Sequence, residues 1–254
     1  MARDTVQRQS DILALARECG RISVETIARR FRVTVQTARR DLAALCARGH
    51  LARVHGGAVP SIGSSHIGYG ARRALNAAAK ARIGRACAAQ VPDGTSVFVD
   101  VGTTCEAVAE ALGGRRGLMV VTNNLNAATI LARNAQAEVI LAGGVLRRAD
   151  GALLGEMTLD FLRPFKLDVA IIGASAIDPE GDLLDFDPGR IRVSQALIEK
   201  ARQRILVSDS SKFARAAPLR IGSLAEIETF VTDAPPPAPL HDRCRDWDTR
   251  VILA

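Results

Sequence analysis

The stretch that decides the fold of the first part of this chain is Val33-Thr34-Val35-Gln36-Thr37-Ala38-Arg39-Arg40-Asp41-Leu42, followed by Arg53-Val54-His55-Gly56-Gly57. Val35, Ala38, Leu42 and Leu45 recur at the spacing of one helical face, which we expect to point inward. Thr34 can cap this helix and Gly49 can end it. Two short strands, around Leu51–Val54 and Ala58–Val59, are expected to flank the turn at residues 55–57.

Two more helices are expected ahead of this one. Ile12, Leu13, Ala16 and Cys19 recur at helical spacing, and Ser23 is a suitable N-cap for a second helix that ends near Phe31. A short turn at Arg32-Val33 then leads into the third helix. Three helices with a three- to four-residue turn before the last are typical of the helix-turn-helix, and the strand pair adds a wing.

The third helix of such a domain enters the major groove of DNA. Gln36 and Thr37 are placed to meet base edges, and Arg39 and Arg40 to reach bases or phosphates. The full set of expected DNA-binding residues is Thr34, Gln36, Thr37, Arg39, Arg40, Arg53 and His55. We expect Asp41 to be structural and paired with a neighbouring arginine, because DNA repels a carboxylate. The alternative is an amphipathic helix whose arginines are merely solvated.

The charge distribution favours the DNA-binding interpretation. Residues 1–60 carry eleven Arg and five acidic residues, so nearly all of the net charge of +7 lies in the first quarter of the chain. A basic module on a nearly neutral body indicates a polyanionic partner for the module alone.

Composition excludes several other classes. The N-terminus has no apolar core typical of a secretory signal, and no run of about 18 apolar residues could cross a bilayer. The five cysteines form no Cys-x-x-Cys pair and the four histidines are scattered, so we expect no disulfide framework and no metal. These features indicate a soluble protein of the cytoplasm that needs no cofactor.

Beyond a Gly- and Ser-rich linker over residues 61–74, the chain alternates between strands and helices. Such alternation predicts an α/β domain over residues 75–254 with a mostly parallel sheet. The expected strands are Ser96–Asp100, Leu118–Thr122, Glu138–Leu141, Val169–Gly173, Ile205–Ser208, Thr229–Thr232 and Arg250–Leu253. The expected helices are Leu75–Gln90, Cys105–Leu112, Asn126–Ala132 and Ile191–Arg202.

Polar and glycine-containing turns follow four of these strands, where ligands bind in such sheets. The turn Asp100-Val101-Gly102-Thr103-Thr104 leads into a helix whose free N–H groups could bind an anion. Asn123-Asn124, Gly143-Gly144 and Gly173-Ala174-Ser175 follow the next strands. We expect a phosphate at Gly102, Thr103 and Thr104, with Asp100 and Asn124 selecting hydroxyl groups; ordinary αβ turns are the alternative for any one of them.

The segment around residues 33–58 resembles the N-terminal domain of DeoR-type bacterial repressors. The family pattern runs close to Val-Ser-x-x-Thr-Ile-Arg-Arg-Asp-Leu, then Gly-x-Leu-x-Arg-x-His-Gly-Gly-Ala, with Thr34 in place of the Ser and Ala38 in place of the Ile. The resemblance implies a transcriptional regulator with a winged helix-turn-helix domain and a larger, Rossmann-like sensor domain related to ribose-5-phosphate isomerase.

The sensor-domain resemblance also implies ligand contacts. Lys80 lies where the isomerases have a phosphate-binding lysine, and Lys212 lies near the expected strand ends. The isomerase motif Gly-Ala-Asp-Glu-Ile-Asp is Gly173-Ala174-Ser175-Ala176-Ile177-Asp178 here, so its two carboxylates are absent. An isomerase needs a base to move a proton, so we expect binding without turnover and no enzyme.

Within the family, the stretches Asp100–Ala109, Val121–Asn126, Leu141–Gly144 and Gly155–Phe161 are most similar to members controlled by glycerol-3-phosphate, which makes this metabolite the leading effector. Arg190 and Val193-Ser194 depart from the family pattern and leave a different sugar phosphate as the alternative. The sign of regulation, repression or activation, stays open. The expected partners are operator DNA, a phosphorylated small molecule and a second copy of the chain, in a dimer or tetramer, and no membrane.

Overall fold

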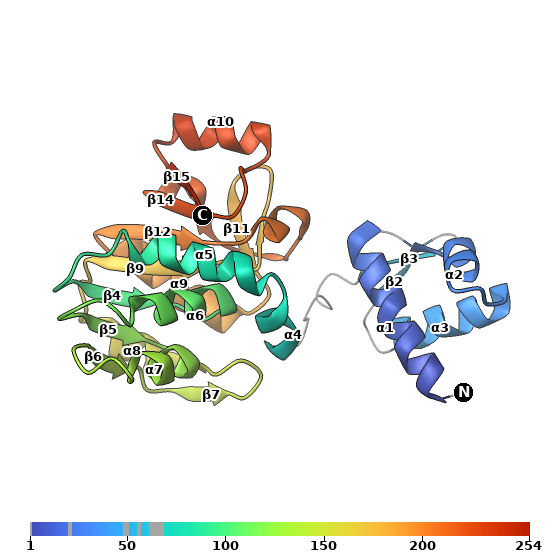
Figure 1. Ribbon diagram of the computed structural model, residues 1–254, viewed down its shortest axis with the longest axis horizontal. Helices are drawn as coiled ribbons and strands as arrows, with labels where there is room; N and C mark the ends of the chain where they lie inside the picture. The colour runs from blue at the N-terminus through green and yellow to red at the C-terminus, as the bar shows by residue number, and fades with distance from the viewer. Residues whose placement is uncertain (1, 20–21, 48–50, 55–56, 61–68) are drawn as a thin grey trace. The chain divides into compact units, whose positions relative to one another are not determined.

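A computed structural model describes residues 2–19, 22–47, 51–54, 57–60 and 69–254. The chain divides into two compact units, Met1–Ile67 and Gly68–Ala254, which are considered separately below (Figure 1). In the part of the chain that the structure describes, no helix has both the length and the apolar character needed to cross a bilayer.

The N-terminal unit is a winged helix-turn-helix. Its helices are α1 (Ala2–Cys19), α2 (Val24–Arg30) and α3 (Val35–Ala47). Strands β1 (Ile22–Ser23), β3 (Gly57–Pro60) and β2 (Leu51–Val54) form an antiparallel sheet in that order. The Ser23 hydroxyl caps α2 by accepting from Thr26 N. The predicted fold of this segment is confirmed.

The three helices pack on a small apolar core. Ile12, Ile27, Leu42 and Leu45 are all fully buried or nearly so. Val35 was expected to face the same core, but it is 43% exposed, so that expectation was wrong. The buried face of α3 begins only at Ala38, because the apolar spacing extends one turn beyond the part of the helix that packs on its neighbours.

The C-terminal unit is built on a seven-stranded, fully parallel sheet. Its strands lie in the order β15-β14-β12-β9-β4-β5-β6. Their bounds are β4 Ser96–Val99, β5 Met119–Thr122, β6 Glu138–Leu141, β9 Val169–Gly173, β12 Gln203–Val207, β14 Thr229–Thr232 and β15 Arg250–Leu253. The predicted α/β class with a parallel sheet is confirmed.

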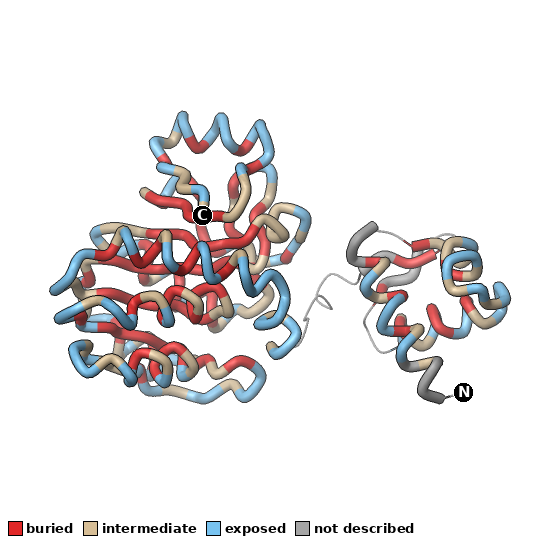
Figure 2. Tube along the Cα trace, in the orientation of Figure 1, coloured by how far each residue is buried: buried red, intermediate tan, exposed pale blue. Residues whose placement is uncertain are grey.

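Helices cover both faces of this sheet (Figures 1 and 2). One core includes Val97, Ile171 and Val207 from the strands and side chains of α5 (Ala77–Ala88), α6 (Thr103–Leu112) and α7 (Leu125–Leu131). The other includes Phe98 and Ile172, with side chains of α8 (Glu156–Leu162), α9 (Pro188–Lys200) and α10 (Ala238–Asp246). The side chains of successive strand residues therefore pack into opposite cores, as expected of a sheet that is buried on both faces.

Helices α5 and α6 approach each other closely at Gly84. A Cβ atom at this position would lie 2.3 Å from the carbonyl oxygen of Ala107. Since no side chain separates the two backbones, α5 and α6 form a closely packed pair on one face of the sheet.

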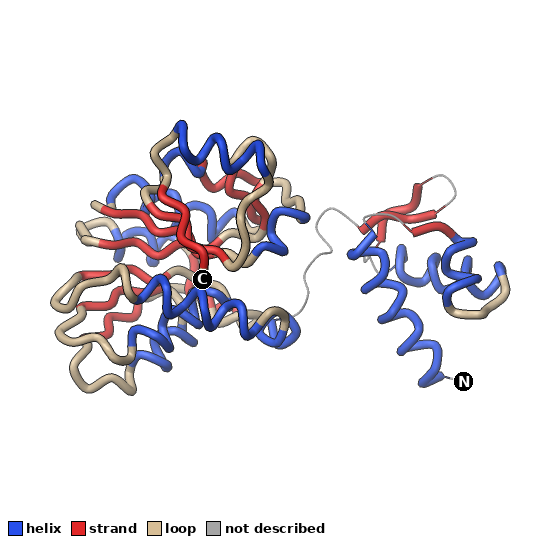
Figure 3. The backbone as a smooth tube through the Cα atoms, turned by 45° about the horizontal axis from the view of Figure 1, so that its top comes forward, coloured by secondary structure: helices blue, strands red, loops and turns tan. Residues whose placement is uncertain are grey.

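Several short elements were not expected from the sequence (Figure 3). Strands β7 (Val145–Arg147) and β8 (Ala152–Leu154) form a hairpin, and β10 (Ala176–Ile177), β11 (Asp182–Asp185) and β13 (Leu219–Ser223) form a small antiparallel sheet. The 3₁₀ helices η1 and η2 span Ser210–Ala214 and Leu224–Glu226. Residues 61–68 of the expected linker lie outside the described residues, but its last part forms helix α4 (Tyr69–Ala74).

Candidate functional site

Helix α3 presents a polar and cationic face. Gln36, Arg39 and Arg40 are exposed on it. Thr34 caps the helix by accepting from Thr37 N at 3.1 Å, and the two threonine hydroxyls are hydrogen-bonded to each other at 2.9 Å. Val35, beside Gln36, was not among the expected DNA-binding residues, but it is exposed and offers an apolar surface of the kind that can meet a thymine methyl group.

More arginines extend this cationic surface. Arg29 and Arg30 lie in the last turn of α2, and Arg32 lies in the turn before α3 with φ of 51°. All three are exposed, and none of them forms an ion pair with another described residue. Arg53 belongs to β2, and His55 lies outside the described residues.

In the C-terminal unit, a polar cavity lies at the carboxyl ends of β4, β9 and β12. These three strands are neighbours in the sheet, so the segments that follow them converge. Helices α4, α5 and α9 complete the wall. The lining residues are Arg72, Leu75, Lys80, Gly102, Thr103, Thr104, Cys105, Gly173, Ala174, Ser175, Arg190, Val207, Asp209, Lys212 and Arg215.

One side of this cavity is suited to bind an anion. Gly102 adopts φ of 144°, a backbone conformation that favours glycine, and α6 begins at the next residue. The first N–H groups of a helix have no acceptor within the helix, and its N-terminus carries a partial positive charge. Thr103 and Thr104 add their hydroxyl groups at this point.

Two lysines lie at the same cavity. Lys80 is only 5% exposed, and its ammonium donates to the carbonyl oxygens of Arg72 and, at 2.7 Å, of Leu75. Burial lowers its pKa, although Asp209 opposes this change. Burial, reinforced by the nearby Arg215, lowers the pKa of Lys212 to about 7. An anionic ligand would restore the charge on such an amine.

A buried network forms the inner wall of the cavity. Arg190 Nη1 lies 2.5 Å from Asp185 Oδ2, and its Nη2 lies 3.4 Å from Asp100 Oδ2 and donates to Gly173 O at 3.0 Å. Burial opposes the charge of Arg190, but the two carboxylates outweigh it and raise its pKa. Burial raises the pKa of Asp100 despite Arg190, whereas at Asp185 the guanidinium outweighs burial and the pKa is lowered.

Two details of this network matter for a ligand. Ser175 donates to Asp185 Oδ2 at 2.8 Å, and Ser194 donates to Asp100 Oδ2 at 3.1 Å. Arg190 Nε is buried and has no hydrogen-bond acceptor among the described residues. Arg190 Nε is therefore an unused donor of this network. The sequence reasoning noticed Arg190 only as a departure from the family pattern.

Five of the expected effector-binding residues lie outside the cavity lining. Asn124 caps α7 and donates to Asp100 O at 3.3 Å, and Asn123 donates to Leu153 O at 3.2 Å. Gly143 O accepts from Thr158, while a Cβ on Gly144 would lie 2.1 Å from Thr158 Oγ1. These residues join the ends of β5 and β6 to the β7–β8 hairpin and to α8. Asp100 reaches the cavity through Arg190 and through Gly173, whose N–H donates to Asp100 Oδ2 at 3.5 Å.

The cavity lining contains one carboxylate, Asp209. Its Oδ1 already accepts from Asn76 at 2.8 Å and from Ser211. Burial strongly raises the pKa of the Cys105 thiol, so it stays protonated at neutral pH. No group of three or more potential metal ligands occurs among the described residues. The arrangement is suited to hold an anion and its hydroxyl groups.

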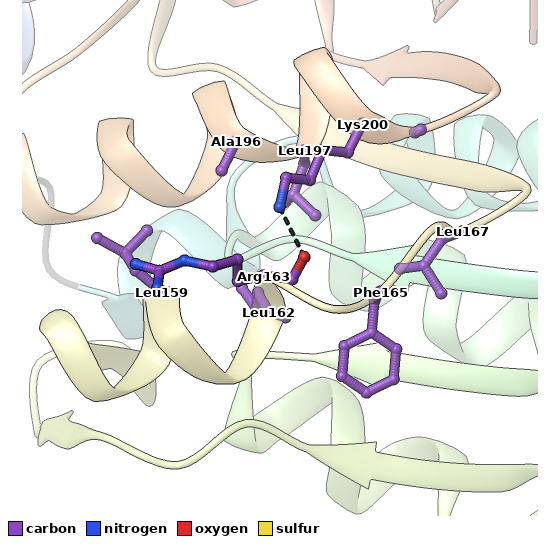
Figure 4. Close-up of a pocket in the computed structure, with 9 residues that line it drawn as sticks. Leu159, Leu162, Arg163, Phe165, Leu167, Ala196, Leu197 and Lys200 are labelled. Atoms are coloured by element: carbon purple, nitrogen blue, oxygen red, sulfur yellow. Dashed lines mark hydrogen bonds between the residues drawn. The ribbon is translucent and has the colours of Figure 1, made fainter.

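A second cavity, of about 130 Å³, lies between α8 and α9 (Figure 4). Leu159, Leu162, Phe165 and Leu197 make it largely apolar, and Lys200 Nζ donates across it to Arg163 O at 2.7 Å. Apart from Arg163 and Lys200 its lining is apolar, so it is less suited to an anion than the polar cavity at the carboxyl ends of β4, β9 and β12.

Comparison with known proteins assigns both units. The DeoR-like helix-turn-helix domain matches residues 8–61, and the DeoR C-terminal sensor domain matches residues 75–234. The chain therefore belongs to the DeoR family of transcriptional repressors, and it is a DNA-binding regulator.

Individual relatives are similar over nearly the full length. The chain is 44% identical over 247 residues to the glycerol-3-phosphate regulon repressor of Escherichia coli, covering 97% of this chain and 98% of that one. It is 42% identical over 246 residues to the repressor of the same name from Haemophilus influenzae, covering 97% and 96%. Ribose-5-phosphate isomerase A from Neisseria gonorrhoeae shares 18% identity over 55% of this chain and 54% of its own, with a TM-score of 0.39.

Proposed function

We propose that this protein represses transcription by binding operator DNA through α3 and the wing, and that glycerol-3-phosphate lowers its operator affinity. The observation that carries the effector half of this proposal is the cationic cavity at the start of α6, where Lys80, Lys212 and Arg72 surround the free N–H groups of a helix. The identity to repressors named for the glycerol-3-phosphate regulon supports the choice of ligand.

For DNA, we assign base reading to Gln36, Arg39 and Arg40, the exposed polar residues of α3. Arg29, Arg30 and Arg32 then contact phosphates, with Arg53 and His55 of the wing region. Because phosphate contacts release counterions, binding should weaken steeply as salt rises. Operators read by helix-turn-helix proteins have two half-sites, so we propose a dimer or tetramer acting in the bacterial cytoplasm.

For the effector, we assign the phosphate to Gly102, Thr103, Thr104, Lys80 and Lys212. Hydrogen bonds to an ionised group are roughly twice as strong as neutral ones, which makes the phosphate essential. We assign the hydroxyl groups of the ligand to Ser175 and Arg190 Nε, which line the same cavity. Asp100 and Asn124 were first expected to bind these hydroxyl groups. We assign them an indirect role, because Asp100 accepts from Arg190 and Asn124 donates to the carbonyl oxygen of Asp100.

The ligand should leave the cavity unchanged. Moving a proton between adjacent carbons needs a base. At the positions of the two isomerase carboxylates stand Ser175, which donates to Asp185, and the buried Ala176. These residues supply no base, which supports a sensor rather than an isomerase.

Operator-binding titrations of the full-length protein test the proposal. Glycerol-3-phosphate should lower operator affinity about 5–150-fold, the range typical of allosteric coupling, and glycerol should have no effect. The variants Lys80→Ala and Thr104→Ala should remove this response, whereas Lys166→Ala and Thr129→Ala, matched changes away from the cavity, should retain it. Equal induction by glycerol, or full induction of both cavity variants, would contradict the phosphate site.

A different sugar phosphate is the second candidate effector. Arg190 and Ser194 stand where family members commonly have other residues, and they shape the wall that would read the hydroxyl groups. Thermal unfolding with a panel of three- to six-carbon phosphates separates the two candidates, because a ligand at 100 times its dissociation constant adds about 2.7 kcal/mol to folding stability.

A further inference from the structure

Helix α4 borders both the effector cavity and the chain that leads to the DNA-binding unit. Arg72 and Leu75, in α4 and directly after it, line the cavity. Only residues 61–68 separate α4 from Pro60, the last residue of β3 in the wing. A change at α4 is therefore close, along the chain, to the DNA-binding unit.

The ammonium of Lys80 holds the end of α4. It donates to the carbonyl oxygens of Arg72 and Leu75, which lie in the last turn of the helix and just beyond it. Carbonyl groups at the end of a helix have no partner within the helix, and a lysine ammonium is a suitable donor for them. Without a ligand, the phosphate-binding lysine is thus occupied by α4.

Two further contacts fix the same short helix. Tyr69 Oη donates to Glu106 Oε2 at 2.7 Å. Asn76, which joins α4 to α5, has φ of 54° and donates to Asp209 Oδ1 at 2.8 Å. All the contacts named here are polar, so charge in the cavity can alter them.

The phosphate and α4 compete for Lys80. An ammonium forms stronger hydrogen bonds with an ionised phosphate than with neutral carbonyl groups. Arg72 can also bind the phosphate, because it has a donor available. Its Nε is buried without an acceptor among the described residues, and its Nη2 lies 3.6 Å from Asp150 Oδ2. A guanidinium can bind phosphate with two parallel hydrogen bonds.

We propose that Arg72 is a direct ligand of the effector phosphate, and that the phosphate releases the end of α4 by taking Lys80 from the carbonyl oxygens of Arg72 and Leu75. This inference rests on the proposed function, because it needs the phosphate to bind beside α6. It makes α4 the element that passes the signal toward the DNA-binding unit.

Hydrogen exchange on the full-length protein tests the release of α4. The Leu75 amide, which donates to Ala71 O, reports on the last turn of the helix. With saturating glycerol-3-phosphate, or inorganic phosphate as a smaller probe, its exchange rate should rise at least about tenfold, as expected from the loss of one charge-assisted hydrogen bond. The amides of α10, remote in the chain, serve as the internal control.

Calorimetric titration tests the Arg72 contact. Arg72→Gln should weaken glycerol-3-phosphate binding at least about tenfold. Arg73→Gln removes the same charge from an exposed neighbour on the same helix and should leave the affinity unchanged. Thermal unfolding of each variant verifies that it is folded.

The outcomes separate this inference from the proposed function. A raised Leu75 exchange rate with a weakened Arg72→Gln variant supports the inference. Normal binding with an unchanged or slower exchange rate, or an Arg72→Gln affinity equal to that of Arg73→Gln, would overturn the inference alone. If neither glycerol-3-phosphate nor inorganic phosphate binds, the proposed phosphate site is wrong, and the inference with it.

Discussion

Arg8 of α1 reaches Asp41 of α3, with Nε 2.7 Å from Oδ2. Gln9 donates to the other oxygen of the same carboxylate at 2.9 Å, and Asp41 is only 2% exposed. The acidic residue in the middle of the recognition helix therefore ties it to the first helix. Asp41 was expected to be structural and paired with a neighbouring arginine; the pairing is confirmed, but the partner is an arginine 33 positions away in the chain.

Replacing this carboxylate should destabilise the DNA-binding unit. Asp41→Ala leaves Gln9 and Arg8 without their shared acceptor, and we expect it to lower the unfolding free energy by about 2 kcal/mol. Asp11→Ala, which alters an exposed carboxylate on α1, should cost less than about 0.5 kcal/mol. Denaturant unfolding of the full-length protein measures both, and equal stability of the two variants would contradict the structural role.

Arg40 should contribute to operator binding through base or phosphate contact. Arg40→Ala should weaken binding by about 1–3 kcal/mol if the residue reads a base, and should reduce the salt dependence if it contacts a phosphate. Titrations between 50 and 200 mM salt distinguish these roles. Arg133→Ala, at an exposed site in the sensor domain, is the matched control. An operator affinity that changes neither with salt nor in Arg40→Ala would show that this surface does not bind DNA.

Effector binding should depend on pH through Lys212, whose pKa lies near 7 in the free protein. Above that pH the free amine is neutral, so phosphate binding must take up a proton. Affinity should then be nearly constant between about pH 6 and 7 and fall by up to about tenfold per unit above pH 7. The phosphate does not cause this fall, because its second pKa is about 6.

Calorimetry in buffers of different ionisation enthalpy detects this proton uptake. The charges facing Lys212 are Arg215, Lys80 and Arg190, which lower its pKa, and Asp209, which raises it. Lys212→Met should bind weakly with no proton uptake at any pH. An affinity that rises with pH above pH 7 would show that Lys212 does not contact the phosphate.

The bound metabolite should be recovered intact. Incubation of the protein with glycerol-3-phosphate or ribose-5-phosphate, followed by NMR spectroscopy, should show no new product over hours, since Ser175 and Ala176 provide no base. Slow formation of ribulose-5-phosphate that is lost in Lys80→Ala would instead indicate residual isomerase activity.

Elements with a strong local pattern could be predicted from the sequence. The strands Val169–Gly173 and Thr229–Thr232 have the predicted bounds, because apolar runs between turn residues mark a buried parallel strand. The edge strand Glu138–Leu141 also has the predicted bounds, although it is only partly buried. Helix α4 was missed because a segment of six residues that includes a glycine is too short to show an apolar stripe. Its end is also held by Lys80, which belongs to the next helix and is a contact that the local sequence does not show.

The convergence of the strand ends could be predicted only in part. Gly102, Ser175 and Lys212 share one cavity because β4, β9 and β12 are neighbours in the sheet. Asn123 and Gly143 follow β5 and β6, which lie on the other side of β4. Strand order depends on tertiary packing, so a sequence that shows four similar turns does not reveal which of them meet.

The contact at Gly84 limits where an effector-driven motion can occur. With the backbones of α5 and α6 packed against each other, α5 has little room to move relative to α6. Any movement of α4 relative to α5 must then change the backbone angles at Asn76, the single left-handed residue between α4 and α5. Asn76 would then be the pivot of α4, and a displacement caused by the phosphate would be passed along the chain through residue 69 toward the DNA-binding unit.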